Sequence, residues 1–218
     1  MSFTITEENY IKAIFHLSEE GDENISTNGI AKAVNATAAS VTDMLKKLKQ
    51  KKIITYEKYY GVRLTAQGEK IAKSVIRKHR LWEVFLVEKL GYSWDQIHDI
   101  AEQLEHIQSD ELIDKLEKFL GFPKFDPHGD PIPDASGNMK SQKQYLLSKL
   151  QKGYKGTVLG VKDSSSKLLQ YLNELEIHLG TGIEIMDIVE FDGSLIIQLN
   201  KKKKVTLSKQ VAQNIFVS

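Results

Sequence analysis

The sequence predicts a mainly α-helical fold with a β-rich C-terminal part. Amphipathic helical patterns dominate up to about residue 120. Alternating apolar residues, which are typical of strands, return after about residue 153. All four prolines fall within residues 121–140, which marks a boundary between the two kinds of pattern. We therefore expect three domains, the second of which ends in the linker: residues 1–72, 73–140 and 141–218.

The first domain is expected to be a winged helix-turn-helix. After a first amphipathic helix, Ser26 and Thr27 can cap a second helix, and a third helix begins near Thr37. The third helix is expected to bury Val41, Met44, Leu45 and Leu48. The segment 53–65 alternates around Tyr60-Gly61 and therefore predicts a hairpin wing.

The exposed start of the third helix is a candidate DNA-contacting surface. Small and hydroxyl side chains allow a helix to lie deep in a major groove, where methyl groups can contact thymine. Between Met44 and Arg80 the sequence has twelve Lys and Arg residues but only two acidic ones, which suits phosphate contact. An ordinary helical domain whose lysines only solvate one face is the alternative. The candidate DNA-binding residues are Thr37, Ala38, Ala39, Ser40, Thr42, Asp43, Lys47, Tyr60 and Arg63.

The second domain contains a pattern that predicts a metal site. A helix expected to begin near Ser93 would place four side chains within an arc of about 100°: His98, Glu102, Glu105 and His106. An earlier helix adds His79 and Glu83, one turn apart. Imidazoles and carboxylates that converge can bind a divalent ion. A solvated helix face is the alternative on spacing alone.

Composition excludes several other classes of protein. The chain has no cysteine, which rules out disulfides, thiolate zinc knuckles and cysteine nucleophiles. The net charge is +1, so any basic surface must be local. The first residues do not resemble a signal peptide, and no apolar run approaches the ~18–20 residues of a membrane span. We therefore expect a cytoplasmic protein with no membrane partner.

Several motifs together resemble the iron- and manganese-dependent repressor family of bacteria, which includes the diphtheria toxin repressor and the manganese transport regulators. The likeness covers nearly the whole chain and is closest to the longer manganese-responsive members. The motifs are Glu8-Asn9-Tyr10, residues 77–83, Ile97-His98-Asp99 with Glu102 and Glu105-His106, Ser109-Asp110-Glu111, and residues 121–124 and 127–133.

This resemblance implies a winged-helix domain, a helical metal-binding and dimerisation domain, and a C-terminal SH3-like barrel similar to the iron-transport accessory fold. It also implies a metal-dependent transcriptional regulator that represses metal-uptake genes and is not an enzyme. Such a regulator binds palindromic double-stranded DNA as a homodimer. No small organic substrate is expected.

The resemblance also implies particular ligands. An activating site would use Glu102, Glu105 and His106, completed near Asn9. A second site would use His79, Glu83 and His98. In some long manganese regulators the His79 position instead joins groups from the loop and the third domain, which here are Asp126, His128 and Asp163. Both versions of the second site remain open.

Three positions bear on the choice of metal. Asn9 stands where the family usually has Asp or Met, and Lys12 stands where short manganese regulators have a Glu ligand. Glu102 stands where iron-responsive members have Cys. Oxygen and nitrogen donors without thiolate suit Mn²⁺ and Fe²⁺, and we expect Mn²⁺ over Fe²⁺. Zn²⁺ and other divalent ions are expected to bind in vitro as well.

Three other classes of protein compete with this interpretation. A metallohydrolase would need an open coordination position and a general base, and the sequence contains no HExxH motif. A winged-helix regulator gated by a small organic ligand would make the His/Glu face incidental. A purely structural dimer module would leave the basic segment unexplained.

Overall fold

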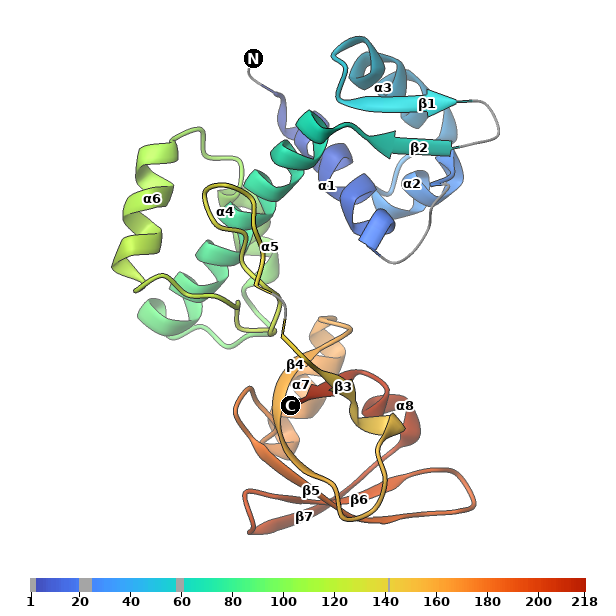
Figure 1. Cartoon of the computed structure of the whole chain (residues 1–218), viewed down its shortest axis with the longest axis vertical. Helices are drawn as coiled ribbons and strands as arrows, with labels where there is room; N and C mark the ends of the chain where they lie inside the picture. Colours follow the sequence, from blue (N-terminus) through green and yellow to red (C-terminus); the bar gives the residue numbers. More distant parts are fainter. Residues whose placement is uncertain (1–2, 20–24, 58–60, 141) are drawn as a thin grey trace. The chain divides into compact units, whose positions relative to one another are not determined.

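The computed structural model describes residues 3–19, 25–57, 61–140 and 142–218 (Figure 1). The chain divides into two compact units. Unit 1 comprises residues 1–79, 103–114 and 133–138, and unit 2 comprises residues 80–102, 115–132 and 139–218. The predicted domain boundaries stay a prediction.

Three helices and a hairpin form the winged helix-turn-helix of unit 1. The helices are α1 (Ile5–Glu19), α2 (Thr27–Ala33) and α3 (Ala38–Gln50), and the hairpin consists of β1 (Ile54–Glu57) and β2 (Gly61–Leu64). The two strands are antiparallel, with Ile54 opposite Leu64. Apolar residues from all of these elements form the core: Ile11, Ile14, Ile30, Val41, Leu45, Leu48, Ile54 and Val62 are at most 2% exposed. Tyr60 lies outside the described residues.

Hydroxyl side chains begin the helices of unit 1 where the sequence predicted. Ser26 Oγ accepts the Gly29 N–H at the start of α2, and Thr37 Oγ1 accepts the Ser40 N–H at the start of α3. Such caps satisfy amides that have no partner within the helix. On α3, Met44 is only half-buried, so the prediction that it is a core residue was wrong. It lies between the buried stripe formed by Val41, Leu45 and Leu48 and the exposed face.

Three further helices follow, and the first two of them carry four of the ten candidate metal ligands: His79, Glu83, His98 and Glu102. The three helices are α4 (Ala66–Leu90), α5 (His98–Leu104) and α6 (Asp110–Phe119). The predicted start of α5 near Ser93 was wrong, because Ser93 begins a turn in which its carbonyl accepts the Gln96 N–H at 3.0 Å. The helix α5 ends at Leu104, so Glu105 and His106 follow it. The four side chains therefore do not share the single-helix arc that the sequence predicted.

A six-stranded antiparallel sheet occupies unit 2, in the order β3-β8-β4-β5-β6-β7. Figure 1 shows β5, β6 and β7 as neighbours. The elements are β3 (Tyr145–Leu146), the 3-10 helix η1 (Leu147–Lys149), β4 (Lys155–Val161), α7 (Ser166–Leu175), β5 (Gly182–Ile188), β6 (Leu195–Leu199), β7 (Lys203–Leu207), α8 (Lys209–Ala212) and β8 (Ile215–Val217). This sheet is the β-rich C-terminal part that the alternating pattern predicted.

The core of unit 2 joins the sheet to α7 and to Trp94. Ile183, Ile185 and Ile197 are buried together with Leu169 and Leu172 of α7. Burial of apolar area contributes roughly 25 cal/mol per Å², so this core is the main source of the sheet's stability. Among the described residues, none of the helices combines the length and the apolar character that a membrane span requires.

Candidate metal clusters and DNA-binding surface

Glu8 of α1 and His106 meet in unit 1. Glu8 Oε2 lies 2.6 Å from His106 Nδ1, although the two residues are 98 positions apart. Both side chains are almost completely buried, and Gln108 Nε2 donates to the other oxygen of Glu8 at 3.0 Å. A buried carboxylate must be compensated by donors or cations. Glu8 therefore belongs to this cluster, although the sequence pattern pointed only to its neighbour Asn9.

Glu105 is the fully buried centre of this group of side chains, which we call the first cluster: Glu8, Lys12, His79, Glu105 and His106. Its Oε2 lies 2.6 Å from His79 Nδ1, and its two oxygens lie 2.7 Å and 2.9 Å from Lys12 Nζ. His106 Nε2 approaches Oε1 at 3.6 Å. Burial raises the pKa of Glu105, but the hydrogen bond with His79 and the charge of Lys12 outweigh it and hold the pKa below its ordinary value. Glu105 is therefore an anion at neutral pH.

Asn9 contributes a buried oxygen with no partner. Its Oδ1 atom makes no hydrogen bond in the described part of the chain. Such an atom costs free energy unless something satisfies it, and a bound cation is one such partner. Asn9 follows Glu8 on α1. Its amide oxygen and the carboxylates of Glu8 and Glu105 are hard oxygen donors, and the imidazoles are borderline nitrogen donors. The residues present therefore fit a divalent metal ion.

His98 and Glu102 lie on α5 in unit 2. His98 Nε2 is 3.8 Å from Glu102 Oε1, one helical turn away, and the His98 side chain is 57% exposed. Two predicted ligand sets combine residues of both units and stay predictions: Glu102 with Glu105 and His106, and His98 with His79 and Glu83.

A second His/carboxylate cluster is completely within unit 2. Glu83 on α4, Asp126 and His128 are buried, and each offers a ligand atom within 4.8 Å of the others. His128 Nδ1 lies 3.6 Å from Glu83 Oε1, whereas its Nε2 lies 2.9 Å from the carbonyl oxygen of Trp94. Because a carbonyl only accepts, Nε2 carries a proton and Nδ1 faces Glu83. This is the orientation in which His128 would bind a metal through Nδ1.

Burial and mutual repulsion control protonation in the second cluster. Desolvation, followed by the charge of Glu83, raises the pKa of Asp126 to about 7. Burial lowers the pKa of His128, but the hydrogen bond and charge of Glu83 outweigh it and raise that pKa to about 9. A metal ion must displace the protons of its ligands, so binding here would depend on pH.

A tight loop presents His128 to Glu83. Asp126 Oδ1 accepts the backbone N–H groups of His128 at 2.8 Å and of Asp130 at 3.0 Å, and Arg80 Nε lies 3.4 Å from Asp126 Oδ2. Gly129 has a φ of +91° and lies so close to β4 that an added Cβ would be 2.1 Å from a carbonyl oxygen there. Only glycine fits this position, and it holds the loop against the sheet.

Asp163 is separate from the second cluster. Its side chain is exposed and accepts the Ser165 N–H at 2.8 Å, where α7 begins. It lines a polar cavity of about 310 Å³ together with Asp95 and His98. Of the predicted set in the loop and third domain, the structure brings together Asp126 and His128 but not Asp163.

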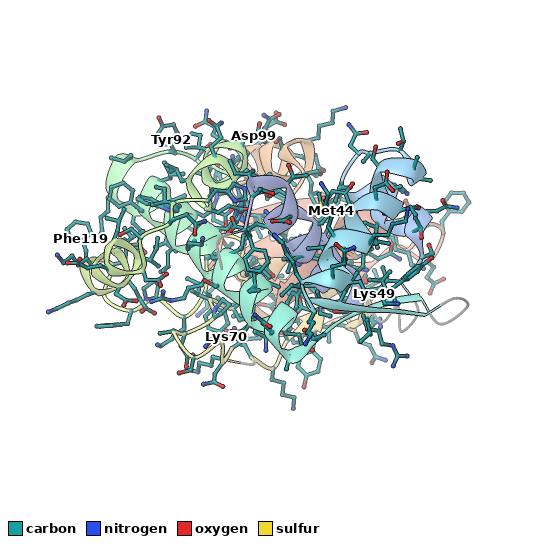
Figure 2. All side chains as sticks on the ribbon, turned by 90° about the horizontal axis from the view of Figure 1, so that it is seen from above. Met44, Lys49, Lys70, Tyr92, Asp99 and Phe119 are labelled. Carbon is teal, nitrogen blue, oxygen red and sulfur yellow. The ribbon has the colours of Figure 1, made fainter. Side chains whose placement is uncertain are left out.

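The candidate DNA-binding residues that the structure describes lie on the exposed face of α3, at its cap and on β2. Seven of them are solvent-exposed on α3 or at its cap: Thr37, Ala38, Ala39, Ser40, Thr42, Asp43 and Lys47. The Thr42 hydroxyl donates to the Ala38 carbonyl at 2.8 Å, so it can only accept a further hydrogen bond. Lys49, which projects from α3 in Figure 2, donates to the Tyr56 carbonyl of the hairpin at 3.1 Å. Arg63 is exposed on β2.

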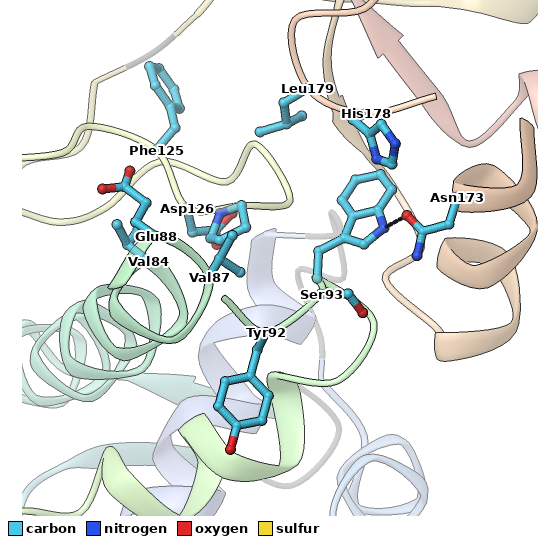
Figure 3. Close-up of a pocket in the computed structure, with 12 residues that line it drawn as sticks. Val84, Val87, Glu88, Tyr92, Ser93, Phe125, Asp126, Asn173, His178 and Leu179 are labelled. Carbon is cyan, nitrogen blue, oxygen red and sulfur yellow. Dashed lines mark hydrogen bonds between the residues drawn. The ribbon is translucent and has the colours of Figure 1, made fainter. Parts of the chain in front are cut away.

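A cavity of about 480 Å³ lies beside Trp94 in unit 2 (Figure 3). Its lining is mostly apolar and includes Val84, Val87 and Phe125. Asn173 Oδ1 accepts the Trp94 indole N–H at 2.6 Å. The contacts around this cavity orient Trp94 and, through its carbonyl, His128.

The winged helix-turn-helix defines a DNA-binding protein, and the His/carboxylate clusters consist of groups that fit divalent metal ions. Residues 2–62 match the N-terminal DNA binding domain of iron dependent repressors, and residues 65–134 match their metal binding and dimerisation domain. Residues 145–218 match the FeoA domain. The chain belongs to the iron-dependent repressor family.

Known proteins agree with this assignment. The chain is 34% identical to the diphtheria toxin repressor of Corynebacterium jeikeium over 128 residues, which are 59% of this chain and 53% of that protein. It thus spans about half the length of that repressor. It is 37% identical to the HTH-type transcriptional regulator MntR of Oceanobacillus iheyensis over 120 residues, 55% of this chain and 80% of that one.

The fold of the whole chain also matches a solved structure. A manganese-dependent transcriptional repressor in complex with manganese aligns with a TM-score of 0.88 at 33% identity, covering 97% of this chain and 99% of that one. The relatives are transcriptional regulators, which removes the metallohydrolase alternative.

Proposed function

We propose that this chain is a metal-dependent, DNA-binding transcriptional regulator that represses metal-uptake genes. In this proposal it acts in the cytoplasm as a homodimer on palindromic double-stranded DNA. Its relatives include a diphtheria toxin repressor and a manganese-dependent transcriptional repressor, which supports both the regulatory role and the metal requirement.

The observation that carries the proposal is the double role of α1. Ile11 and Ile14 of this helix are fully buried in the winged helix-turn-helix core. The same helix supplies Glu8 to His106 and carries the unpartnered oxygen of Asn9. A metal ion held by these groups would tie α1, and with it the DNA-binding fold, to the segment that follows α5. Metal binding would then shift the population of conformations that can bind DNA.

The donors favour Mn²⁺, with Fe²⁺ as the alternative. Carboxylate, amide and imidazole groups are present, and the chain has no thiolate. Hard oxygen donors suit Mn²⁺ and Fe²⁺, whereas Zn²⁺ can still bind tightly because affinity rises along the Irving–Williams order. Several of the similar solved structures are described as manganese-dependent or manganese-activated repressors. Isothermal titration calorimetry with Mn²⁺, Fe²⁺ and Zn²⁺ would rank the affinities of the three ions.

The cluster of Glu83, Asp126 and His128 is proposed as a second metal site. The three groups are buried and close together, and His128 Nδ1 faces Glu83. An ion there would replace the proton of His128 and relieve the repulsion between the two carboxylates. Because Asp126 also holds the loop through two backbone amides, we expect the ion to stabilise the arrangement of residues 126–130.

Dimerisation would place two α3 helices on one palindrome. Two recognition helices bind well only when their spacing matches one turn of DNA, which is about 34 Å. Residues 65–134 match a dimerisation domain, and unit 2 exposes Leu90, Phe119 and Phe122 in that range. Exposed large apolar side chains of this kind are typical of protein interfaces.

A substitution of Glu105 tests the proposed function. Glu105→Gln keeps the shape of the side chain but removes the charge, so metal-stimulated binding to promoter DNA should be lost. Asp114→Asn is the matched control, because Asp114 is an exposed carboxylate that pairs with Arg77 outside the cluster. Fluorescence anisotropy of a labelled promoter duplex measures the DNA affinity of both variants with and without Mn²⁺. A full metal response in Glu105→Gln would contradict the assignment of the site.

A further inference from the structure

Lys12 faces the carboxylate at the centre of the first cluster. Its Nζ atom lies 2.7 Å from one oxygen of Glu105 and 2.9 Å from the other. The Lys12 side chain is 13% exposed and that of Glu105 is 0% exposed, so water screens this pair only weakly. The ammonium group therefore interacts with both oxygens that Glu105 could offer to a metal.

An ammonium group and a metal ion cannot share Glu105 without cost. A lysine side chain has three donors and no acceptor when it is charged, so it cannot become a ligand itself. Two cations next to one buried carboxylate repel each other strongly, since the surroundings have a low effective dielectric constant. The ammonium group must retreat, or lose part of its contact, when a divalent ion binds Glu105.

The ammonium group also has a role before metal arrives. Glu105 is buried and ionised, and an unpaired buried charge destabilises a fold strongly. His79 and Lys12 compensate this charge in the structure. Lys12 thus holds α1 against the segment after α5 through the same carboxylate that the proposed metal would use.

We propose that Lys12 is a built-in cation that competes with the activating metal ion for Glu105 and so raises the metal concentration to which the protein responds. This inference rests on the proposed function of the cluster. It assigns Lys12 a role in setting the response threshold, and it predicts that removing the charge strengthens metal binding.

The test compares Lys12→Met with Lys51→Met. Methionine keeps much of the length of lysine but removes its charge. Lys51 is the matched control, because its Nζ lies 2.6 Å from Glu7 of the same helix α1, outside the cluster. Isothermal titration of the metal-free full chain with Mn²⁺, at fixed pH and salt, gives the affinity and the number of ions bound.

Lys12→Met should bind Mn²⁺ about tenfold more tightly than the wild type, whereas Lys51→Met should differ by less than about twofold. Without metal, Lys12→Met should also melt at a lower temperature, and Mn²⁺ should restore the loss. Lys12→Arg keeps the charge and should retain the wild-type affinity. If Lys12→Met does not fold without metal, Lys12→Gln provides the same comparison, because its amide can still donate to Glu105.

Unchanged or weaker Mn²⁺ binding by a folded Lys12→Met protein would overturn the inference. Equal tightening by Lys12→Arg would overturn it too, because the charge would then not be the cause. A wild-type protein that binds no Mn²⁺ would instead refute the proposed function. The two failures are therefore distinguishable.

Discussion

Glu8 Oε2 and His106 Nδ1 lie 2.6 Å apart and join the first helix of the DNA-binding fold to the residues that follow α5. Glu8→Gln removes the carboxylate charge that holds His106, so we expect metal affinity to fall about 10–100-fold. Glu7→Gln is the control, because Glu7 is equally buried on α1 but pairs with Lys51. Isothermal titration calorimetry measures the Mn²⁺ affinity of both variants. Similar losses in the two variants would show that α1 is merely destabilised.

Two substitutions on α3 should separate DNA affinity from DNA sequence preference. Lys47 is exposed, and Lys47→Ala should weaken binding to all DNA sequences. It should also lower the slope of the logarithm of the binding constant against the logarithm of the salt concentration by about 1. Ala39→Gln should instead change the preferred base at one position, since a longer polar side chain would reach into the groove. Binding to a panel of duplexes at several salt concentrations checks both. Neither change should alter Mn²⁺ affinity, and an equal effect on metal binding would count against the separation of the two surfaces.

Gly129→Ala should be much more destabilising than Gly180→Ala. Both glycines have positive φ values, +91° and +82°, but only at Gly129 would a Cβ collide with a backbone carbonyl. The left-handed conformation costs roughly 1–2 kcal/mol for alanine at either position. The collision should raise the loss in free energy of unfolding for Gly129→Ala to about 3 kcal/mol or more, since β4 must also move. Urea unfolding measures the difference, and equal costs would mean that the loop relaxes freely.

The stability of the metal-free protein should fall as pH rises from 6.5 to about 9. The pKa of His128 is raised from 6.5 to about 9 in the folded state, so the native protein holds more protons than the unfolded chain in this range. This contribution is fully present below pH 6.5 and is lost as the pH passes the folded pKa. Urea denaturation in the presence of a chelator, repeated across this pH range, measures the slope of the free energy of unfolding against pH. His128→Gln should have a flatter slope, and an unchanged slope would assign the effect to another group.

Local patterns predicted most of the helices and strands because the signals for these elements lie within a few residues. Ser26 caps α2 through its own side chain, as expected from the sequence. The third helix was expected to begin near Thr37, and Thr37 is the residue that caps it. The start of α5 could not be predicted in this way. The sequence predicted a helix that begins near Ser93, but the Ser93 carbonyl accepts the Gln96 N–H in a turn and the helix begins only at His98.

The composition of the clusters was harder to predict than their existence. The spacing indicated Glu105 and His106, but Glu8 reaches His106 across 98 positions, and no local pattern encodes such a contact. The available signal was the spacing of Glu8, three and seven positions before Ile11 and Phe15, which places a carboxylate on the apolar face of the first helix. The ion pair of Lys12 with Glu105 likewise depends on tertiary packing across 93 positions.

Binding of a palindromic promoter duplex by the wild-type chain, at fixed salt, tests the central claim most directly. Affinity is measured first with a chelator and then with added Mn²⁺, Fe²⁺ or Zn²⁺. We expect weak binding with the chelator and strong stimulation by Mn²⁺ or Fe²⁺, because the ion would join α1 to the rest of the first cluster. Tight binding in the presence of the chelator, unchanged by any of these metals, would contradict a metal-dependent regulator.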